Sequence, residues 1–498
     1  MRWEATSGPS SRLLCEEAPL EQGVERDTVH VVRRVGDRPL RVGGSPRPGP
    51  EALLAGCTLE LQLGKRQGVV FPEGLQDAVV RDGCDGGELL GDGIVGHDPE
   101  SRRLRDRVHE SGALSAAVRL MDVPVSVVGG FVRDALLGLP HGPDIDLVVE
   151  GDAIELARRL GRALGAMLVP HEAFGTATLE LPHGGEIDLV TARRESYAHP
   201  GALPEVVPGS LADDLARRDF TVNAIAFRLS GPHAGAVTDP HGGRADLSAG
   251  LVRVMRGDAF VEDPSRVVRA ARYAARLAFA LEPQTDAAAR AAAAGVDLGS
   301  ARVADELRRL LVEPAAGGGV ALLADVRVPW LRGAPSKTAL VERFDALDGA
   351  LAHTRAPRLP AWPLRLGLVA DADAIAGSAL PGWARGLAGE AALGPVLAGR
   401  LAAPGLAPSQ VDGILGSTPD ATSCAALTLG AEIVARWWES WRDVRLEIRG
   451  ADLVSAGVRP GPGIGRGLRA ARAAAIDGRA EGRDRQLEVA LEGARADR

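Results

Sequence analysis

The sequence predicts an α+β protein in which a mixed α/β region is followed by a long, all-helical region. Between about residues 101 and 250, short β-type runs alternate with segments of helical spacing. From about residue 251 to 498, Ala- and Arg-rich helical stretches prevail. Six of the seven tryptophans lie in the C-terminal third, which therefore has core residues of its own. The length of 498 residues, at roughly 150 per domain, predicts about three folded units.

The first 100 residues are rich in Gly, Pro, Asp and Arg and show no sustained hydrophobic period. Short apolar stretches occur at 29–32 and 59–63. This composition fits three alternatives: a small accessory β-rich domain, a partly disordered extension, or sequence upstream of a true start at Met121. We assign the region no function.

The mixed region is expected to consist of short elements in a fixed order. A helix is predicted over 101–120, and a compact β run follows at 125–128. The next expected elements are a helix over 131–137, a strand over 144–149, an amphipathic helix over 152–164, and strands over 176–181 and 186–191 joined by a glycine turn.

Composition argues against several classes of protein. No apolar run approaches the ~18 residues needed to cross a bilayer, and the N-terminus has no basic-then-apolar signal pattern, so we expect a cytoplasmic protein without a membrane partner. The four cysteines are scattered without a CxxC pair, which predicts free thiols and no structural zinc. The net charge of −8 does not indicate a nucleic-acid binder, but a local arginine stripe can still bind phosphates.

The first pattern that carries chemistry is the β run that ends in Gly129-Gly130 at the start of a helix. Such a turn exposes backbone N–H groups to an anion, and Arg133, one helical turn further on, can add charge-assisted hydrogen bonds. This arrangement suits a triphosphate.

The second pattern is Asp144-Ile145-Asp146 on the next expected strand. A period of two puts both carboxylates on one face while Ile145 enters the core. Neighbouring carboxylates repel each other unless a cation lies between them, so a divalent pair is the natural occupant. Two ions roughly 3.5 to 4 Å apart can activate an attacking hydroxyl and neutralise a departing pyrophosphate. Mg²⁺ is the expected metal, with Mn²⁺ as the alternative.

Together with Arg133-Asp134 and Leu137-Gly138, these patterns resemble the bacterial class II tRNA nucleotidyltransferase and poly(A) polymerase family over about residues 124–312. The resemblance implies a DNA polymerase β-like nucleotidyltransferase head, a small mixed sheet with helices, followed by a helical neck, body and tail. It also implies a role for the glycine turn and Arg133 in binding the incoming triphosphate, and for the paired acids in binding the metals.

Two further parts of the head match the family. Asp188, on the strand expected over 186–191, is the candidate for a third catalytic carboxylate. The segment 214–226 is similar to the family motif DLxRRDFTxNAxA, which implies contacts with the sugar and phosphates. Arg217 and Arg218 can reach phosphate, and Asn223 can both donate to and accept from a hydroxyl.

The segment 262–272 resembles the family's EDxxR motif, which implies that side chains select the incoming base. Asp263 can accept from the exocyclic amine of cytosine or adenine, and Arg266 can donate to a ring nitrogen or carbonyl oxygen. Helical spacing places Arg266, Arg269, Arg272 and Arg276 on one stripe, opposite Val267, Ala271, Ala274 and Ala275. A solvated basic face is the alternative interpretation.

Two later segments are assigned less directly. Glu306, on the helix expected after residue 302, is predicted to order the neck through salt bridges to arginines. The glycine-rich segment 450–466 resembles one near the end of some family members, and Arg459 and Arg466 within it can contact tRNA phosphates. A rigid helix–turn–helix corner is the equal alternative there.

We therefore predict an N-terminal extension (1–100), a nucleotidyltransferase head (101–250), a helical neck that recognises the base (251–315) and a helical tRNA-binding body and tail (316–498). The predicted enzyme adds CCA, or its terminal A, to the 3′ end of tRNA from CTP and ATP without a template and without an obligate protein partner. The intact segment 191–213 favours addition of A, and the absence of a basic Gly-Arg-Arg-Phe pattern after residue 168 argues against a poly(A) polymerase, which stays the alternative within the family. A catalytically inactive RNA-binding protein and a dinucleotide-binding oxidoreductase are the rivals from other classes, although GxGxxG is absent.

Overall fold

The computed structural model describes residues 98–140, 142–196, 205–333 and 336–495, together with the backbone of three earlier strands. The chain forms two compact units, residues 1–91 and 92–498. In the first unit, β1 (His30–Val35), β2 (Arg38–Gly43) and β3 (Leu59–Leu61) pair antiparallel in the order β2-β1-β3. The three alternatives for residues 1–100 stay predictions. The expectations for the rest of residues 1–97 lie outside the described residues.

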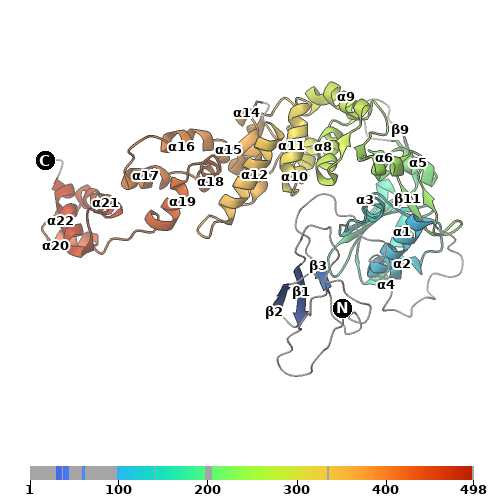
Figure 1. The fold of residues 1–498 in the computed structure, drawn as a ribbon, viewed down its shortest axis with the longest axis horizontal. Helices are drawn as coiled ribbons and strands as arrows, with labels where there is room; N and C mark the ends of the chain where they lie inside the picture. The colour runs from blue at the N-terminus through green and yellow to red at the C-terminus, as the bar shows by residue number, and fades with distance from the viewer. Residues whose placement is uncertain are drawn as a thin grey trace, which may run out of the picture. The chain divides into compact units, whose positions relative to one another are not determined.

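A mixed sheet of seven strands forms the centre of the head, in the order β12-β11-β4-β5-β8-β7-β6. Figure 1 shows this part of the chain as strands with helices around them. Within this sheet as described, β5 and β8 run parallel and every other neighbouring pair is antiparallel. A dinucleotide-binding fold needs a parallel sheet, so the oxidoreductase alternative is wrong. The strands are β4 (Val125–Val128), β5 (Asp144–Val149), β6 (Met167–His171), β7 (Thr176–Glu180), β8 (Glu186–Thr191), β11 (Ala226–Ser230) and β12 (Val237–Thr238).

Helices and short elements surround this sheet. The helices are α1 (Pro99–Glu110), α2 (Gly112–Val118), α3 (Gly130–Leu136), α4 (Ala153–Leu164), α5 (Leu211–Ala216) and α6 (Gly243–Ala249). Two 3₁₀ turns, η2 (Glu172–Phe174) and η3 (Thr221–Asn223), and an antiparallel pair, β9 (Arg193–Ser196) and β10 (Glu205–Pro208), complete the head.

The single helix predicted over 101–120 is wrong. The helix is interrupted at Ser111, whose backbone is extended. The Ser111 hydroxyl accepts a hydrogen bond from the amide of Leu114 in the first turn of α2. The separate helix α1 then supports α3, because Arg103 and Arg107 donate to the carbonyl oxygens of Leu136 and Leu139 at its C-terminal end. These bonds satisfy carbonyls that a helix end leaves without a partner.

The amphipathic helix predicted over 152–164 is confirmed as α4. Asp152 caps its first turn by accepting from the amide of Glu155, and Gly165 ends it in the left-handed conformation. Its buried face packs on β6, β7 and β8.

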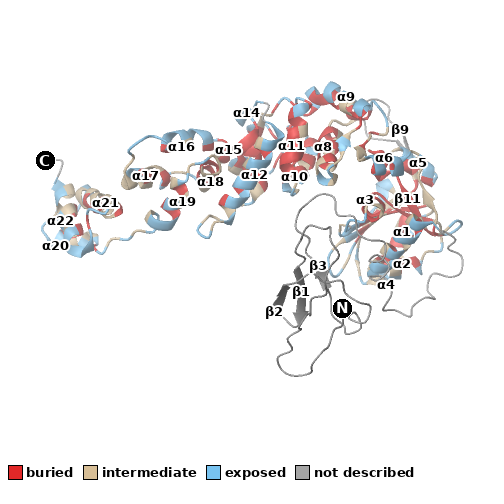
Figure 2. Cartoon of the chain, viewed as in Figure 1, coloured by how far each residue is buried: buried red, intermediate tan, exposed pale blue. Residues whose placement is uncertain are grey.

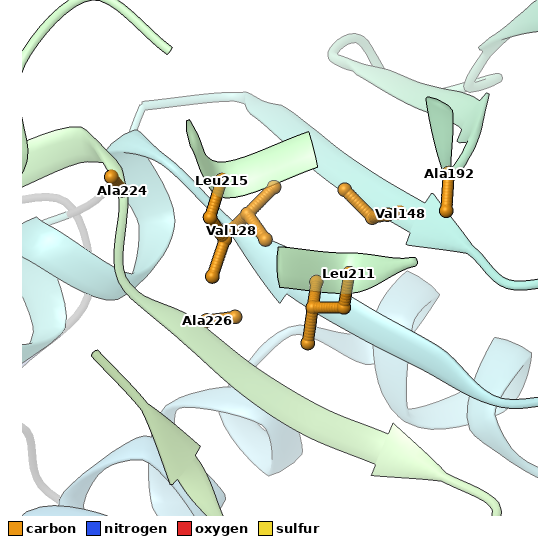
Figure 3. Close-up of a cluster of buried hydrophobic side chains, with 7 residues drawn as sticks. All are labelled: Val128, Val148, Ala192, Leu211, Leu215, Ala224 and Ala226. Carbon is orange, nitrogen blue, oxygen red and sulfur yellow. The ribbon is translucent and has the colours of Figure 1, made fainter. Parts of the chain in front are cut away.

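A cluster of buried apolar side chains joins the sheet to α5 (Figure 3). Leu211 and Leu215 from α5 lie against the strand residues Val128 and Val148, beside Ala192, Ala224 and Ala226. Val128 is the last residue of β4, which ends at the glycine turn. Val148 lies on β5, which begins with the paired acids. This core therefore fixes the two strands that carry the predicted site.

Helices make up most of the chain after residue 250. The elements up to residue 325 are β13 (Leu251–Val252), α7 (Ala259–Glu262), α8 (Ser265–Leu277), β14 (Ala280–Leu281), α9 (Pro283–Ala292), η4 (Ala293–Gly295), α10 (Ala301–Val312) and α11 (Ala316–Asp325). Buried residues concentrate where α8, α10 and α11 pack on one another (Figure 2).

The remaining helices continue to residue 495. They are α12 (Lys337–Ala352), α13 (Ala361–Val369), α14 (Ala372–Ala376), α15 (Gly382–Ala391), α16 (Gly394–Leu401), α17 (Pro408–Leu415), α18 (Asp420–Thr428), α19 (Ile433–Arg436), the π-helix η5 (Trp437–Trp441), α20 (Gly450–Ser455), α21 (Pro462–Ile476) and α22 (Gly482–Arg495). Among the described residues, no helix combines the length and the apolar character that spanning a membrane requires.

Candidate active site

The glycine turn lies directly against one of the paired acids. β4 ends at Val128, and Gly129 follows with φ +72° and ψ −135°, a conformation that favours glycine. A Cβ at this position would lie 2.7 Å from the Oδ2 atom of Asp146 and 3.3 Å from the Nη1 atom of Arg218. Gly129 therefore permits a close approach of the main chain to Asp146. Gly130 begins α3.

The two acids of β5 share one face, as the period of two predicted. Ile145 between them is 3% exposed and belongs to the core. Asp144 is exposed at the start of the strand, and Asp146 is half-buried opposite Val128 of β4. The third predicted carboxylate, Asp188, pairs in register with Asp146 on the parallel strand β8 and accepts a hydrogen bond of 2.6 Å from the Thr178 hydroxyl.

The charge around Asp146 is not balanced by the protein. Burial raises the pKa of Asp146, and the carboxylates of Asp188, Asp144 and Asp214 raise it further, while the charge of Arg218 lowers it. No ion pair joins Asp144, Asp146 or Asp188 to a basic side chain among the described residues. This excess of hard oxygen donors fits a divalent cation. The described residues contain no group of three or more side chains already arranged around a metal position, so Asp188 as a third catalytic acid stays a prediction.

Arg217 and Arg218 are held by an acid that the sequence analysis did not single out. Asp214 is fully buried and accepts from the Nε atom of Arg217 at 2.9 Å and from the Nη2 atom of Arg218 at 3.3 Å. Arg218 also lies beside Gly129, and its Nε atom is buried with no hydrogen-bond partner among the residues that the structure describes. Asp214 therefore fixes a cationic group next to the acids of β5.

Arg133 and Asn223 occupy the interior. Arg133 is 2% exposed; its Nε and Nη2 atoms each lie 2.8 Å from Asp134, and its Nη1 atom donates to the Oδ1 atom of Asn223 at 2.7 Å. The Nδ2 atom of Asn223 donates to Asp219 at 3.1 Å. Both predicted ligands are thus engaged by protein groups, and their contacts with a nucleotide stay predictions.

The arginine stripe of α8 is present, but it does not form a solvated face. Arg269 and Arg272 bind Glu306 of α10, with shortest distances of 2.7 and 3.3 Å, and Arg272 is only 9% exposed. The prediction that Glu306 orders this region through salt bridges is confirmed. Arg276 pairs with Asp134 at 3.6 Å. The side chain of Arg266 has no hydrogen-bond or ion-pair partner within the described part of the chain.

Asp263, the predicted partner of Arg266 in base selection, ends α7. Its Oδ1 atom accepts from the amide and hydroxyl of Ser265, at 3.1 and 2.5 Å, and its Oδ2 atom accepts from Arg302 at 3.2 Å. These bonds fix the carboxylate at the start of α8, three residues before Arg266.

The two arginines predicted to bind tRNA lie far along the chain. Arg459 is exposed in the turn between α20 and α21, and Arg466 is half-buried on α21. A small core that includes Ile448, Leu453 and Ala490 holds α20, α21 and α22 together. This packing agrees with the helix–turn–helix corner, and the phosphate contacts stay a prediction.

A mixed sheet with paired acids beside a glycine turn defines the class of nucleotidyltransferase heads, and comparison with known proteins places the chain within it. Residues 125–253 match the Poly A polymerase head domain. The CC-adding tRNA nucleotidyltransferase of Deinococcus radiodurans is 36% identical over 348 residues, which cover 70% of this chain and 83% of that protein. The chain belongs to the tRNA nucleotidyltransferase family.

Other relatives share a smaller part. The A-adding tRNA nucleotidyltransferase of Halalkalibacterium halodurans is 41% identical over 174 residues, which are 35% of this chain and 40% of that protein. The alignment with the A-adding enzyme of Aquifex aeolicus, at 47% identity, spans 32% of this chain and 19% of that protein. The structure of the Thermotoga maritima CCA-adding enzyme complexed with tRNA matches with a TM-score of 0.64 and 27% identity, over 79% of this chain and 98% of that one.

Proposed function

We propose that this chain adds CCA, or its terminal A, to the 3′ end of tRNA from CTP and ATP. The observation that carries the proposal is the unbalanced pair Asp144 and Asp146 beside the glycine turn. The 3′ hydroxyl of the RNA would attack the α-phosphorus, a new phosphodiester bond would form, and the bond to pyrophosphate would break. A tRNA substrate would place this activity in the cytoplasm.

Asp144 and Asp146 would hold Mg²⁺ or Mn²⁺. When bound, the metal supplies charge that activates the hydroxyl and neutralises the leaving pyrophosphate. The amides of Gly129 and Gly130 and the guanidinium groups of Arg217 and Arg218 would bind the triphosphate.

Base selection is assigned to the start of α8. Asp263 would accept from the exocyclic amine that cytosine and adenine share, and Arg266 would donate to the base. The absence of a described protein partner for Arg266 supports this assignment. Arg459 and Arg466 are proposed tRNA contacts.

A second candidate product is CC without the terminal A. The relative that shares the largest part of this chain among those described is named a CC-adding enzyme, whereas the A-adding relatives match only about a third of the chain. The segment 191–213, which favoured A addition, includes residues 197–204, and these lie outside the described residues.

The test supplies tRNA that ends before the tail, or tRNA that ends in CC, with Mg²⁺ and each nucleotide separately. Addition of C to the first and A to the second supports CCA addition; C alone supports the CC product, and A alone supports terminal A addition. Long runs of A on either RNA would identify a poly(A) polymerase. RNA binding without any incorporation would identify the inactive RNA-binding protein.

Variants identify the catalytic acids. Asp144→Asn and Asp146→Asn should each abolish incorporation, because each removes a carboxylate from the proposed metal site. Glu180→Gln, which changes an exposed acid on β7 of the same sheet, is the matched control and should keep full activity.

A further inference from the structure

Asp214 is a buried acid whose two carboxylate oxygens hold two different arginines. It lies on α5 and is 0% exposed. Its Oδ1 atom accepts from Arg217, and its Oδ2 atom accepts from the Nη2 atom of Arg218 at 3.3 Å. Both arginines follow Asp214 within about one helical turn of the chain, so the acid reaches them without help from another element.

Arg218 lies between this acid and a second one. A Cβ placed on Gly129 would lie 3.3 Å from the Nη1 atom of Arg218 and 2.7 Å from the Oδ2 atom of Asp146, so both side chains approach the same glycine. Arg218 nevertheless pairs with Asp214, and it forms no ion pair with Asp146 in the described part of the chain. Burial raises the pKa of Asp146, and the nearby charge of Arg218 lowers it.

Two contacts hold the guanidinium of Arg218 in this orientation. One is the bond to Asp214, and the other is a bond of 3.5 Å from Nη1 to the carbonyl oxygen of Asn223. Of these two acceptors, Asp214 alone carries a charge. A largely buried guanidinium that loses its carboxylate partner is left uncompensated, and its long side chain can rotate toward the next acid. At this position the next acid is Asp146.

We propose that Asp214 keeps Arg218 away from Asp146, so that Asp146 stays open to the metal while Arg218 stays available to the phosphates. Asp214 is a positioning residue that acts through Arg218. Without it, Arg218 would pair with Asp146 and occupy the place of the cation. The proposal rests on the proposed function, because it assumes the metal site at Asp144 and Asp146.

The expected effect follows from competition for one carboxylate. A divalent cation binds Asp146 only in molecules where Arg218 does not occupy it, so the apparent affinity for the cation falls in proportion to that fraction. If Arg218 occupied Asp146 in about nine of ten molecules of Asp214→Asn, the affinity would fall about tenfold. The loss depends on the presence of an arginine at position 218, whereas a general structural defect does not.

The first experiment measures the affinity of the full chain for Mn²⁺ by electron paramagnetic resonance, without nucleotide. Asp214→Asn should lower this affinity about tenfold, but in the Arg218→Gln background the same change should lower it by less than about threefold. The matched control is Asp213→Asn, which removes the same charge from the neighbouring position of α5. Asp213 accepts from the amide and hydroxyl of Ser210 and does not bind Arg218, so the control should match wild type.

The second experiment needs neither metal nor activity. Urea titrations with a chelator, at neutral pH, measure the effect of Asp146→Asn on the free energy of unfolding. In the wild-type background this change removes an uncompensated buried charge and should raise the free energy of unfolding. In the Asp214→Asn background it breaks the new ion pair with Arg218 and should lower the free energy of unfolding.

Three results would overturn the proposal. The first is wild-type Mn²⁺ affinity in Asp214→Asn, and the second is an equal loss of affinity whether residue 218 is Arg or Gln. The third is a favourable coupling between Arg218 and Asp146 in the wild-type background, measured with Arg218→Gln, Asp146→Asn and the double variant; this cycle remains available if Asp214→Asn does not fold. If the wild-type chain transfers no nucleotide, the proposed function fails, while the urea titrations still test the role of Asp214.

Discussion

Replacing Gly129 by Ala should disable the site through geometry alone. At φ +72° and ψ −135° a side chain is strained by about 1–3 kcal/mol. The added Cβ would also lie 2.7 Å from the Oδ2 atom of Asp146, so that carboxylate or the turn must move. A displacement of about 1 Å at reacting groups costs on the order of a hundredfold in rate, and we expect at least that loss in kcat/KM.

The control is Gly130→Ala at the next position. A Cβ there would meet only the Nη2 atom of Arg133, at an ordinary contact distance of 3.5 Å, and the residue already has a helical backbone. Both variants keep the backbone N–H. The assays are nucleotide incorporation into tRNA, Mn²⁺ binding followed by electron paramagnetic resonance, and thermal unfolding. Wild-type metal binding and turnover in Gly129→Ala, or equal damage in Gly130→Ala, would refute the reasoning.

Three more predictions concern stability. Glu306→Gln should lower the free energy of unfolding by about 3 kcal/mol, because it removes a buried charge that Arg269 and Arg272 share, whereas Asp305→Asn should change it by less than about 0.5 kcal/mol in urea titrations. Burial raises the pKa of Asp219, but the charge of Arg269 and several hydrogen bonds outweigh it and lower the pKa below its ordinary value. Asp219 should therefore contribute its full stability at a pH above the ordinary aspartate pKa of about 4, and this contribution should be lost as the pH falls through the lowered pKa. The free energies of unfolding of wild type and Asp219→Asn should accordingly converge in acid. In α21, Gly467→Ala would place a Cβ against a carbonyl oxygen of α22 and should lower the free energy of unfolding by about 1–3 kcal/mol. A Cβ in Gly465→Ala would meet only the end of an arginine side chain, so this variant should raise the free energy of unfolding by about 0.5–1 kcal/mol. Melting temperatures that shift in the same direction in both variants would contradict this.

Local patterns predicted the parts of the site that depend on neighbouring residues. A period of two is a property of the strand itself, so the shared face of Asp144 and Asp146 and the burial of Ile145 could be predicted without knowledge of the fold. The helix over 152–164 could be predicted for the same reason, since its cap and its apolar face lie within one segment. The break at Ser111 also has a local signal, because a serine followed by glycine within a helical stretch is a favourable start for a new helix.

Contacts between distant segments could not be predicted in this way. Helical spacing placed Arg266, Arg269 and Arg272 on one stripe, but it does not state which helix covers that stripe. Glu306 lies 37 residues from Arg269, and Asn223 lies 90 residues from Arg133, so neither pairing leaves a periodic signal. Asp214 and Asp219 belong to the segment 214–226, but the arginines that each of them binds are determined by the packing and not by the motif.

The balance of charge separates two kinds of buried polar group in this head. Between α8 and α10, Arg269 lies between Asp219 and Glu306, and Arg272 lies between Glu306 and Glu313, so each of these charges has an opposite neighbour. Such pairing is the condition for a charge to be stable inside a protein. On the face of β5 the same protein places Asp144 and Asp146 beside Asp188 and leaves them without an ion pair among the described residues. Since the fold could have neutralised these acids with an arginine, as it does at Asp214, their unbalanced charge is better explained by a ligand that arrives from solution than by stability.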